Sequence, residues 1–207
     1  MALPSLTILD GAGDTQTTPV HTAANGSKTV VHSTDGQLAT YRAGKITATP
    51  VATPTAWLRI KGSGTKTVRI RKIAVSGIAT AAGNMEIVVD KNSTTGTDNG
   101  STVWTAQTYA PLDSGNAAAT AVVEVLTGAN QDALGTSVGK LAAGRVCLTA
   151  DGSGVYVAPF ELNFGTGGQQ AIVLRGATQN VTVGFNGDAV PSGGKLDFFV
   201  EWTEEDE

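Results

Sequence analysis

The sequence predicts an all-β protein: an antiparallel β-sandwich of the jelly-roll kind, with an extended N-terminal arm. Three observations lead to this fold class. Apolar and polar side chains alternate in short segments from Trp57 to Trp202, turn residues (Gly, Asn, Asp, Ser) separate these segments, and helical periodicity is nearly absent. An immunoglobulin-like sandwich is the alternative, although the Cys–Trp–Cys pattern of that fold is missing.

Residues 1–55 are expected to form the arm and its linker, and residues 56–207 the sandwich domain. The first fifty residues are rich in Thr, Ala and Gly and show no strong periodicity. Pro50 and Pro54 stiffen the segment that follows, which suits a linker.

Strands are expected where the period-2 pattern holds, near residues 56–61, 67–75, 85–89, 122–126, 160–164, 172–174, 181–185 and 195–202. In the second of these the apolar positions change phase between Ile70 and Ile73, which predicts a β-bulge or bend at Arg71-Lys72. The longest connection, residues 91–119, is expected to be a loop that carries contacts. The best helical candidate is a short segment near residues 130–140.

The charge distribution is uneven. Charged residues make up 15% of the chain, against about 25% in a typical domain. The net charge of −4 argues against nucleic acid as the main partner. Acidic residues gather at the C-terminus (Glu201, Glu204, Glu205, Asp206, Glu207), and basic residues gather in one earlier stretch (Arg59, Lys61, Lys66, Arg69, Arg71, Lys72). The two groups are either ordinary solvated faces or partners in an electrostatic contact, within one chain or between chains.

No pattern in the sequence predicts catalysis or metal binding. His21 and His32 have no second ligand-type residue at metal spacing, and no nucleophile elbow is present. We therefore expect no enzyme activity, cofactor or metal. No apolar run approaches the ~20 residues of a membrane helix, so no membrane contact is expected. Cys147, in an apolar run, is expected to be buried.

Three stretches of the chain resemble virion structural proteins of tailed bacteriophages. They are residues 109–125 (YAPLDSGNAAATAVVEV), residues 168–176 (GQQAIVLRG), and residues 181–187 with 193–205 (VTVGFNG and GGKLDFFVEWTEE). The resemblance implies a small β-sandwich on the exterior of the particle, with capsid decoration (cement) as its most natural role. The segment before Pro50 lies outside the resemblance.

On this resemblance, the chain is expected to bind the outside of the major capsid protein lattice as a homotrimer and to stabilise the shell. It would be made in the host cytoplasm and reside on the capsid exterior. The alternatives are a tail, baseplate or head-fibre component, a carbohydrate-binding module, and a hydrolase. The candidate contacts with a partner or between subunits are Arg59, Lys61, Arg69, Arg71, Lys72, Trp104, Tyr109, Glu204 and Glu205.

Overall fold

The chain divides into two units, with the boundary after Gln37. In the first unit, β1 (Ser5–Leu9) pairs antiparallel with β2 (Thr15–Pro19), and β3 (His21–Thr22) pairs antiparallel with β4 (Lys28–Thr29). The extended arm is therefore not confirmed, because described parts of this region form two short two-stranded sheets. The computed structural model describes residues 5–9, 15–19, 21–22, 28–29, 38–49, 56–96, 104–127, 134–155, 157–166 and 169–206.

The second unit begins at Leu38, and its described regular elements are all β-strands. The strands are β5 (Ala39–Ala48), β6 (Leu58–Lys61), β7 (Lys66–Ala79), β8 (Gly83–Asn92), β9 (Trp104–Ala106), β10 (Tyr109–Pro111), β11 (Val122–Leu126), β12 (Ser137–Ala150), β13 (Phe160–Asn163), β14 (Ile172–Leu174), β15 (Asn180–Gly184) and β16 (Lys195–Asp206).

Hydrogen bonds join these strands into one twelve-stranded mixed sheet with the order β10-β5-β16-β7-β12-β8-β15-β6-β11-β9. Beside this path, β13 and β14 both pair with β7. The described pairings of this sheet are antiparallel except one, the short parallel contact of Thr149 and Ala150 in β12 with Ile78 and Ala79 in β7. The all-β class is confirmed. A jelly-roll-like sandwich of two separate sheets is not.

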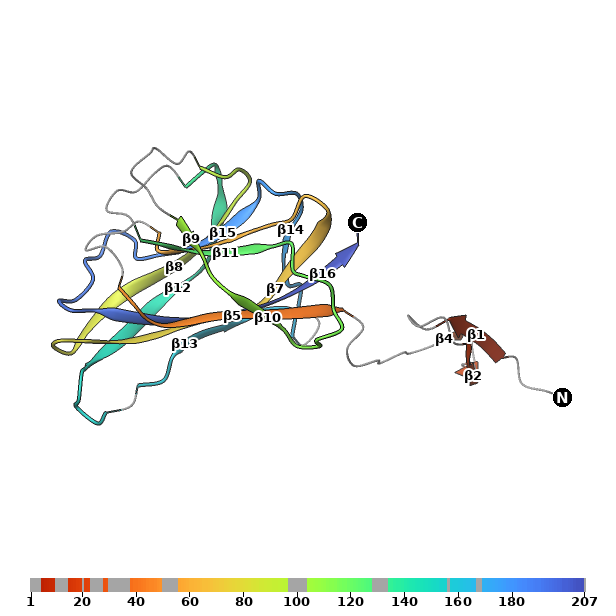
Figure 1. Cartoon of the computed structure of the whole chain (residues 1–207), viewed down its shortest axis with the longest axis horizontal. Helices are drawn as coiled ribbons and strands as arrows, with labels where there is room; N and C mark the ends of the chain where they lie inside the picture. The colour runs from red at the N-terminus through yellow and green to blue at the C-terminus, as the bar shows by residue number, and fades with distance from the viewer. Residues whose placement is uncertain are drawn as a thin grey trace. The chain divides into compact units, whose positions relative to one another are not determined.

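The sheet curls so that side chains from its two parts share one core. Trp57, immediately before β6, stacks on Phe185 beyond β15 at a ring distance of 6.1 Å. It also meets the ring of Phe198 in β16 edge-on at 5.7 Å. In Figure 1, β5 and β10 lie along one side of the domain and β9, β11 and β15 along the opposite side. Burial of the apolar side chains between these strands is the main favourable term in folding.

The predicted bulge is confirmed in β7. Glu201 of β16 lies opposite Lys72, but the next residue, Trp202, lies opposite Ile70, so Arg71 is an extra residue without a partner in β16. The bulge restores the phase of the strand: Ile70 and Ile73 are both fully buried in the core.

The expected domain boundary differs from the observed one. β5, which lies inside the expected arm of residues 1–55, pairs along β16 and buries Tyr41 and Ala43. The sheet domain therefore starts at Leu38 rather than at residue 56. The sequence of β5 does not indicate that the sheet domain starts here, because most of its side chains are small or polar. Its largest aliphatic residue, Ile46, points outward and is 75% exposed. The expected linker, residues 50–55, lies outside the described residues.

Three further expectations are wrong for the residues that the structure describes. Residues 91–119 are not a simple loop, because they contain β9 and β10. Residues 137–140 of the helical candidate form the start of β12, where register shifts at Val138 and Leu141 break the period-2 pattern. Cys147 is exposed, because its neighbours Val146 and Leu148 occupy the core-facing positions.

Candidate functional site

A buried charge cluster lies where β6, β11 and β9 are adjacent. Arg59 Nε and Nη2 each lie 2.8 Å from Glu124 Oε2, and Lys61 Nζ lies 3.1 Å from Glu124 Oε1. The guanidinium of Arg59 also stacks over the Trp104 ring at 4.3 Å. The side chains of Arg59 and Glu124 are only 5% and 10% exposed. Removing one charge from such a cluster lowers the stability of the fold strongly, because the other charge is buried away from water.

The acidic C-terminal residues do contact the basic stretch, and they do so within one chain. Arg69 Nε donates to Glu205 Oε1 at 2.7 Å, and Lys66 pairs with Asp206. Both pairs join β7 to β16. Their side chains are between 28% and 88% exposed, so each pair contributes little stability alone. They help to fix the register of the two strands.

Glu204 is a buried carboxylate at the other face of β16. It accepts hydrogen bonds from the backbone N–H of Thr120 at 3.0 Å, from that of Ala121 at 2.9 Å and from Trp202 Nε1 at 3.0 Å. The ring of Tyr41 stacks on Trp202 at 5.7 Å. Burial, and next the negative charge of Glu204, raises the pKa of Tyr41 above its usual 10.0. The cluster holds the segment before β11 against β5 and β16.

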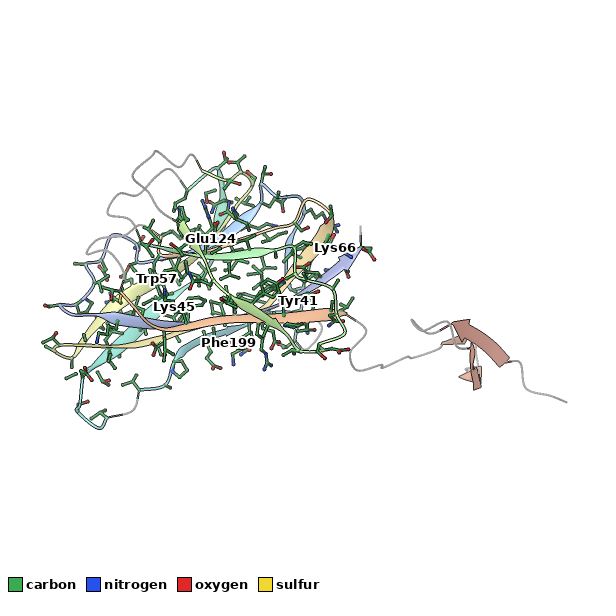
Figure 2. The ribbon with its side chains drawn as sticks, in the orientation of Figure 1. Tyr41, Lys45, Trp57, Lys66, Glu124 and Phe199 are labelled. Carbon is green, nitrogen blue, oxygen red and sulfur yellow. The ribbon has the colours of Figure 1, made fainter. Side chains whose placement is uncertain are left out.

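A shallow hollow of about 320 Å³ lies on the outer face of the β7–β16 pair. It is lined by the small side chains Ala74 and Ser76 of β7, by Phe199 of β16 and by Glu161 of β13. In Figure 2 the label of Glu124 lies above that of the core residue Trp57, and the label of Phe199 lies below it. The carboxylate of Glu161, which lines the hollow, is already paired with Lys72 Nζ at 3.0 Å.

A second hollow, of about 300 Å³, lies over β8 and β12. Glu86 accepts from Arg145 Nη2 and from Asn186 Nδ2, each at 2.8 Å, and Lys140 donates to Asn186 Oδ1 at 3.2 Å. These polar groups satisfy one another across an exposed surface. Nothing in their arrangement supplies a nucleophile beside a base, the pairing that covalent catalysis needs.

The nine candidate contact residues do not converge on one site. Arg59, Lys61 and Trp104 belong to the buried cluster around Glu124. Arg69 and Glu205 pair across β7 and β16, Lys72 pairs with Glu161, and Tyr109 and Glu204 both lie near Trp202. Arg71 is the extra residue of the bulge.

Glu124 was not predicted as the partner of this basic stretch. A signal was available: Glu124 is the one charged residue in the apolar strand β11, so it needs a cation in a neighbouring strand. Tyr41 was missed because its segment was assigned to the arm.

Metal and membrane features are as follows. Within the described ranges, no three His, Cys, Asp or Glu side chains gather as metal ligands, and no helix is long and apolar enough to cross a membrane. Of the two histidines, His21 lies on β3, and His32 lies outside the described residues.

Comparison with known proteins gives no relative for this chain. No protein-family model, curated protein or solved structure matches it.

Proposed function

We propose that this chain is a structural protein of a bacteriophage virion, and most specifically a capsid decoration protein that binds the outside of the major capsid protein lattice. It acts as a homotrimer on the capsid exterior and uses neither cofactor nor metal. Binding only to the assembled lattice stabilises the shell by mass action. The partner is protein, rather than nucleic acid or membrane.

The observation that carries the proposal is that stretches resembling phage virion proteins meet in space. Residues 109–125 and 193–205 are distant in sequence, but Tyr109 packs edge-on against Trp202 at 6.3 Å, and Thr120 and Ala121 donate to Glu204. Residues 181–187 contain most of β15, which pairs with β6 beside β11. The likeness thus covers neighbouring parts of one domain rather than scattered matches.

The charge arrangement supports a binding role. Arg59 and Glu124 neutralise each other in the interior, and Glu205 and Asp206 pair with Arg69 and Lys66. The low share of charged residues, 15% of the chain, suits close packing against another protein, where charged residues are depleted at the interface core.

A finer description of the fold belongs to the same proposal. We regard the domain as a jelly-roll-like sandwich whose two sheets are joined where β12 meets β7. The short length of that contact, Thr149 and Ala150 only, supports this view. So does the packing of Trp57 against Phe198 across the core. An experimental structure in which β12 and β7 share more than a few hydrogen bonds would contradict it.

The function is tested by removing the protein from purified particles of the phage that encodes it and adding it back. We expect the temperature of genome release to rise on adding back the full chain, with a copy number in the hundreds. Because β5 belongs to the sheet, the matched arm-deletion variant lacks residues 1–37 and keeps Leu38 onward. An unchanged release temperature, or binding at the tail vertex alone, would replace this proposal with a tail or fibre role.

A further inference from the structure

Arg71 is the one arginine whose side chain has no polar partner among the described residues. It makes no hydrogen bond, ion pair or ring contact within the parts of the chain that the structure describes. Its N–H donors are therefore left for water or for a binding partner. The other five arginines each donate to an acceptor of the domain: Arg42 to Glu201, Arg59 to Glu124, Arg69 to Glu205, Arg145 to Glu86, and Arg175 to the Thr67 hydroxyl.

The bulge in β7 explains why Arg71 has no partner in the acidic strand β16. Glu201 lies opposite Lys72 and Trp202 lies opposite Ile70, so no residue of β16 lies opposite Arg71. The backbone of Arg71 is bonded instead to the segment that follows β13, where Phe164 N–H donates to Arg71 O at 2.7 Å. β-Bulges re-aim side chains and are frequent beside functional sites.

The bases on both sides of Arg71 in the sequence already hold carboxylates. Arg69 Nε donates to Glu205, and Lys72 Nζ lies 3.0 Å from Glu161. Arg59, Lys61 and Lys66, the remaining members of the basic stretch, each have a carboxylate partner as well. Within the described residues, the positive charge of this stretch that stays uncompensated is therefore that of Arg71.

Gly165 leaves room for the guanidinium of Arg71. This glycine has a φ of +71°, and a Cβ built on it would lie only 3.0 Å from Arg71 Nη1. A side chain at position 165 would therefore displace the guanidinium, whereas glycine adopts this backbone conformation without cost. Arg71 is only partly buried, so a ligand can reach the exposed part of its side chain.

A guanidinium without a partner fits a carboxylate. Its planar fork of N–H donors matches the two oxygens of a carboxylate, and the resulting hydrogen bonds are charge-assisted. Lys45 and Lys195 also have no polar partner among the described residues, but an ammonium group is compact and strongly hydrated. Arginine is more weakly hydrated, and it is enriched at protein interfaces and among their energetically dominant residues.

We propose that Arg71 is the anchor through which this domain binds a carboxylate side chain of a protein partner. This inference rests on the proposed function, and it names the partner group as an aspartate or glutamate on the outer surface of the major capsid protein lattice. Charge complementarity selects an acidic group, because Arg71 is the uncompensated cation of a stretch whose other bases are neutralised. The bulge and Gly165 place the guanidinium, and the partner supplies the carboxylate that β16 does not.

The anchor role is tested by binding fluorescently labelled full-length protein to stripped capsids at several salt concentrations. Arg71→Gln should weaken binding about tenfold or more at low salt and should make binding less dependent on salt. Arg71→Lys keeps the charge but loses the fork, so its affinity should lie between the two. Arg175→Gln is the matched control, because it changes the net charge equally and removes a guanidinium that donates only to a hydroxyl; it should bind as the wild type does.

The stability of the free protein separates a binding role from a structural one. Because the Arg71 side chain has no partner in the described part of the folded domain, Arg71→Gln should keep the urea midpoint of unfolding unchanged or raise it. A structural role predicts a lower midpoint. The same measurement shows that the variant is folded.

The chemistry of the partner group is tested by amidating the exposed carboxylates of the stripped capsids. On these particles the wild type should lose its advantage in affinity over Arg71→Gln, because the group that the guanidinium binds is no longer charged. An advantage that persists would show that the partner group is not a carboxylate.

The outcomes separate this inference from the proposed function. If the wild type binds and Arg71→Gln binds equally well, Arg71 is not the anchor and the inference is overturned, while the decoration role stands. A variant that changes the oligomeric state of the free protein and not its affinity for capsids would assign Arg71 to a contact with a second copy, which also overturns the inference. If the wild type does not bind stripped capsids, the proposed function fails and this inference fails with it.

Discussion

Removing the carboxylate of Glu124 should destabilise the domain more than removal of any surface carboxylate. In Glu124→Ala, Arg59 keeps a side chain that is 5% exposed but loses the oxygen that accepts from both Nε and Nη2. Lys61 loses its ion pair as well, although its side chain is 27% exposed and can be solvated. The variant therefore removes from a buried guanidinium the carboxylate that it contacts through two nitrogens.

The size of the effect follows from burial. Two unit charges about 4 Å apart attract by about 4 kcal/mol at an effective dielectric constant near 20. Measured losses on removing one partner of a buried pair are about 3–5 kcal/mol. Because a domain of this kind has a free energy of unfolding of about 5–15 kcal/mol, Glu124→Ala should lose a large fraction of it.

The assay is equilibrium unfolding in urea followed by tryptophan fluorescence. Trp57 and Trp202 are fully buried and report on the core, while Trp104 stacks on Arg59 and reports on the cluster. Glu86→Ala is the matched control, since Glu86 pairs with an Arg145 side chain that is 59% exposed. The control should lose less than about 1 kcal/mol.

A second variant separates the cost of removing one partner from the net value of the pair. In Arg59→Met with Glu124→Leu both charges are removed, and the free energy of unfolding should recover toward that of the wild type. A loss below about 1 kcal/mol in Glu124→Ala would refute the reasoning, because that is the range of a solvent-screened pair. A double variant less stable than Glu124→Ala would refute it as well.

Three other outcomes are expected. The pKa of Tyr41 is raised by burial, and the pKa of Lys66 is raised by its hydrogen bond to Asp206. Because the folded state holds both protons more tightly than the unfolded state, each group stabilises the fold fully at a pH below its ordinary pKa, 10.0 for Tyr41 and 10.5 for Lys66. This stabilisation is lost as the pH rises above these values. Melting temperatures that do not fall between pH 9 and pH 11.5 would count against this. Gly77→Ala should cost about 1–3 kcal/mol in urea unfolding, because its Cβ would overlap the Lys195 carbonyl, whereas Gly64→Ala, with open space around it, should be neutral within about 0.5 kcal/mol. Native protein should release one equivalent of thionitrobenzoate from Ellman's reagent because Cys147 is exposed, and a silent native thiol would mean that it is buried.

Much of the sheet could be predicted from alternation alone. In β16 the side chains of Leu196, Phe198, Val200 and Trp202 are buried, as their spacing indicates, and the phase change in β7 located the bulge at Arg71. Both strands are long and lie next to each other in the sheet, so their inward faces must be apolar throughout. In these two strands the sequence pattern and the packing place apolar side chains at the same positions.

β5 and β12 could not be predicted in this way, for physical reasons. β5 buries only a tyrosine and small side chains, and it depends on the neighbouring β16 for its place in the sheet. β12 has a largely exposed burial pattern and two bulges, so no alternation survives over its first half. In such strands tertiary pairing decides the conformation and the local pattern does not.

The candidate site was predicted least well. The sequence located the charged groups of both the basic stretch and the acidic end, and it offered pairing within one chain as one of two arrangements. It could not show that Glu204 points inward toward Thr120 while Glu205 points outward to Arg69. That difference depends on the register of β16 against β7, which sequence alone does not supply.

The position of β16 between β5 and β7 has a consequence for how the protein is made. Arg42 of β5 and its partner Glu201 are 159 residues apart in the chain. At about 5–20 residues per second on the ribosome, β16 is synthesised about 8–30 s after β5. During that interval β10 can pair with Tyr41 and Ala43, but β16 and the ring of Trp202 are missing and the sheet cannot close. Cells that synthesise the chain slowly, or chaperones that shield its early segments, should therefore change the yield of folded protein without changing its final stability.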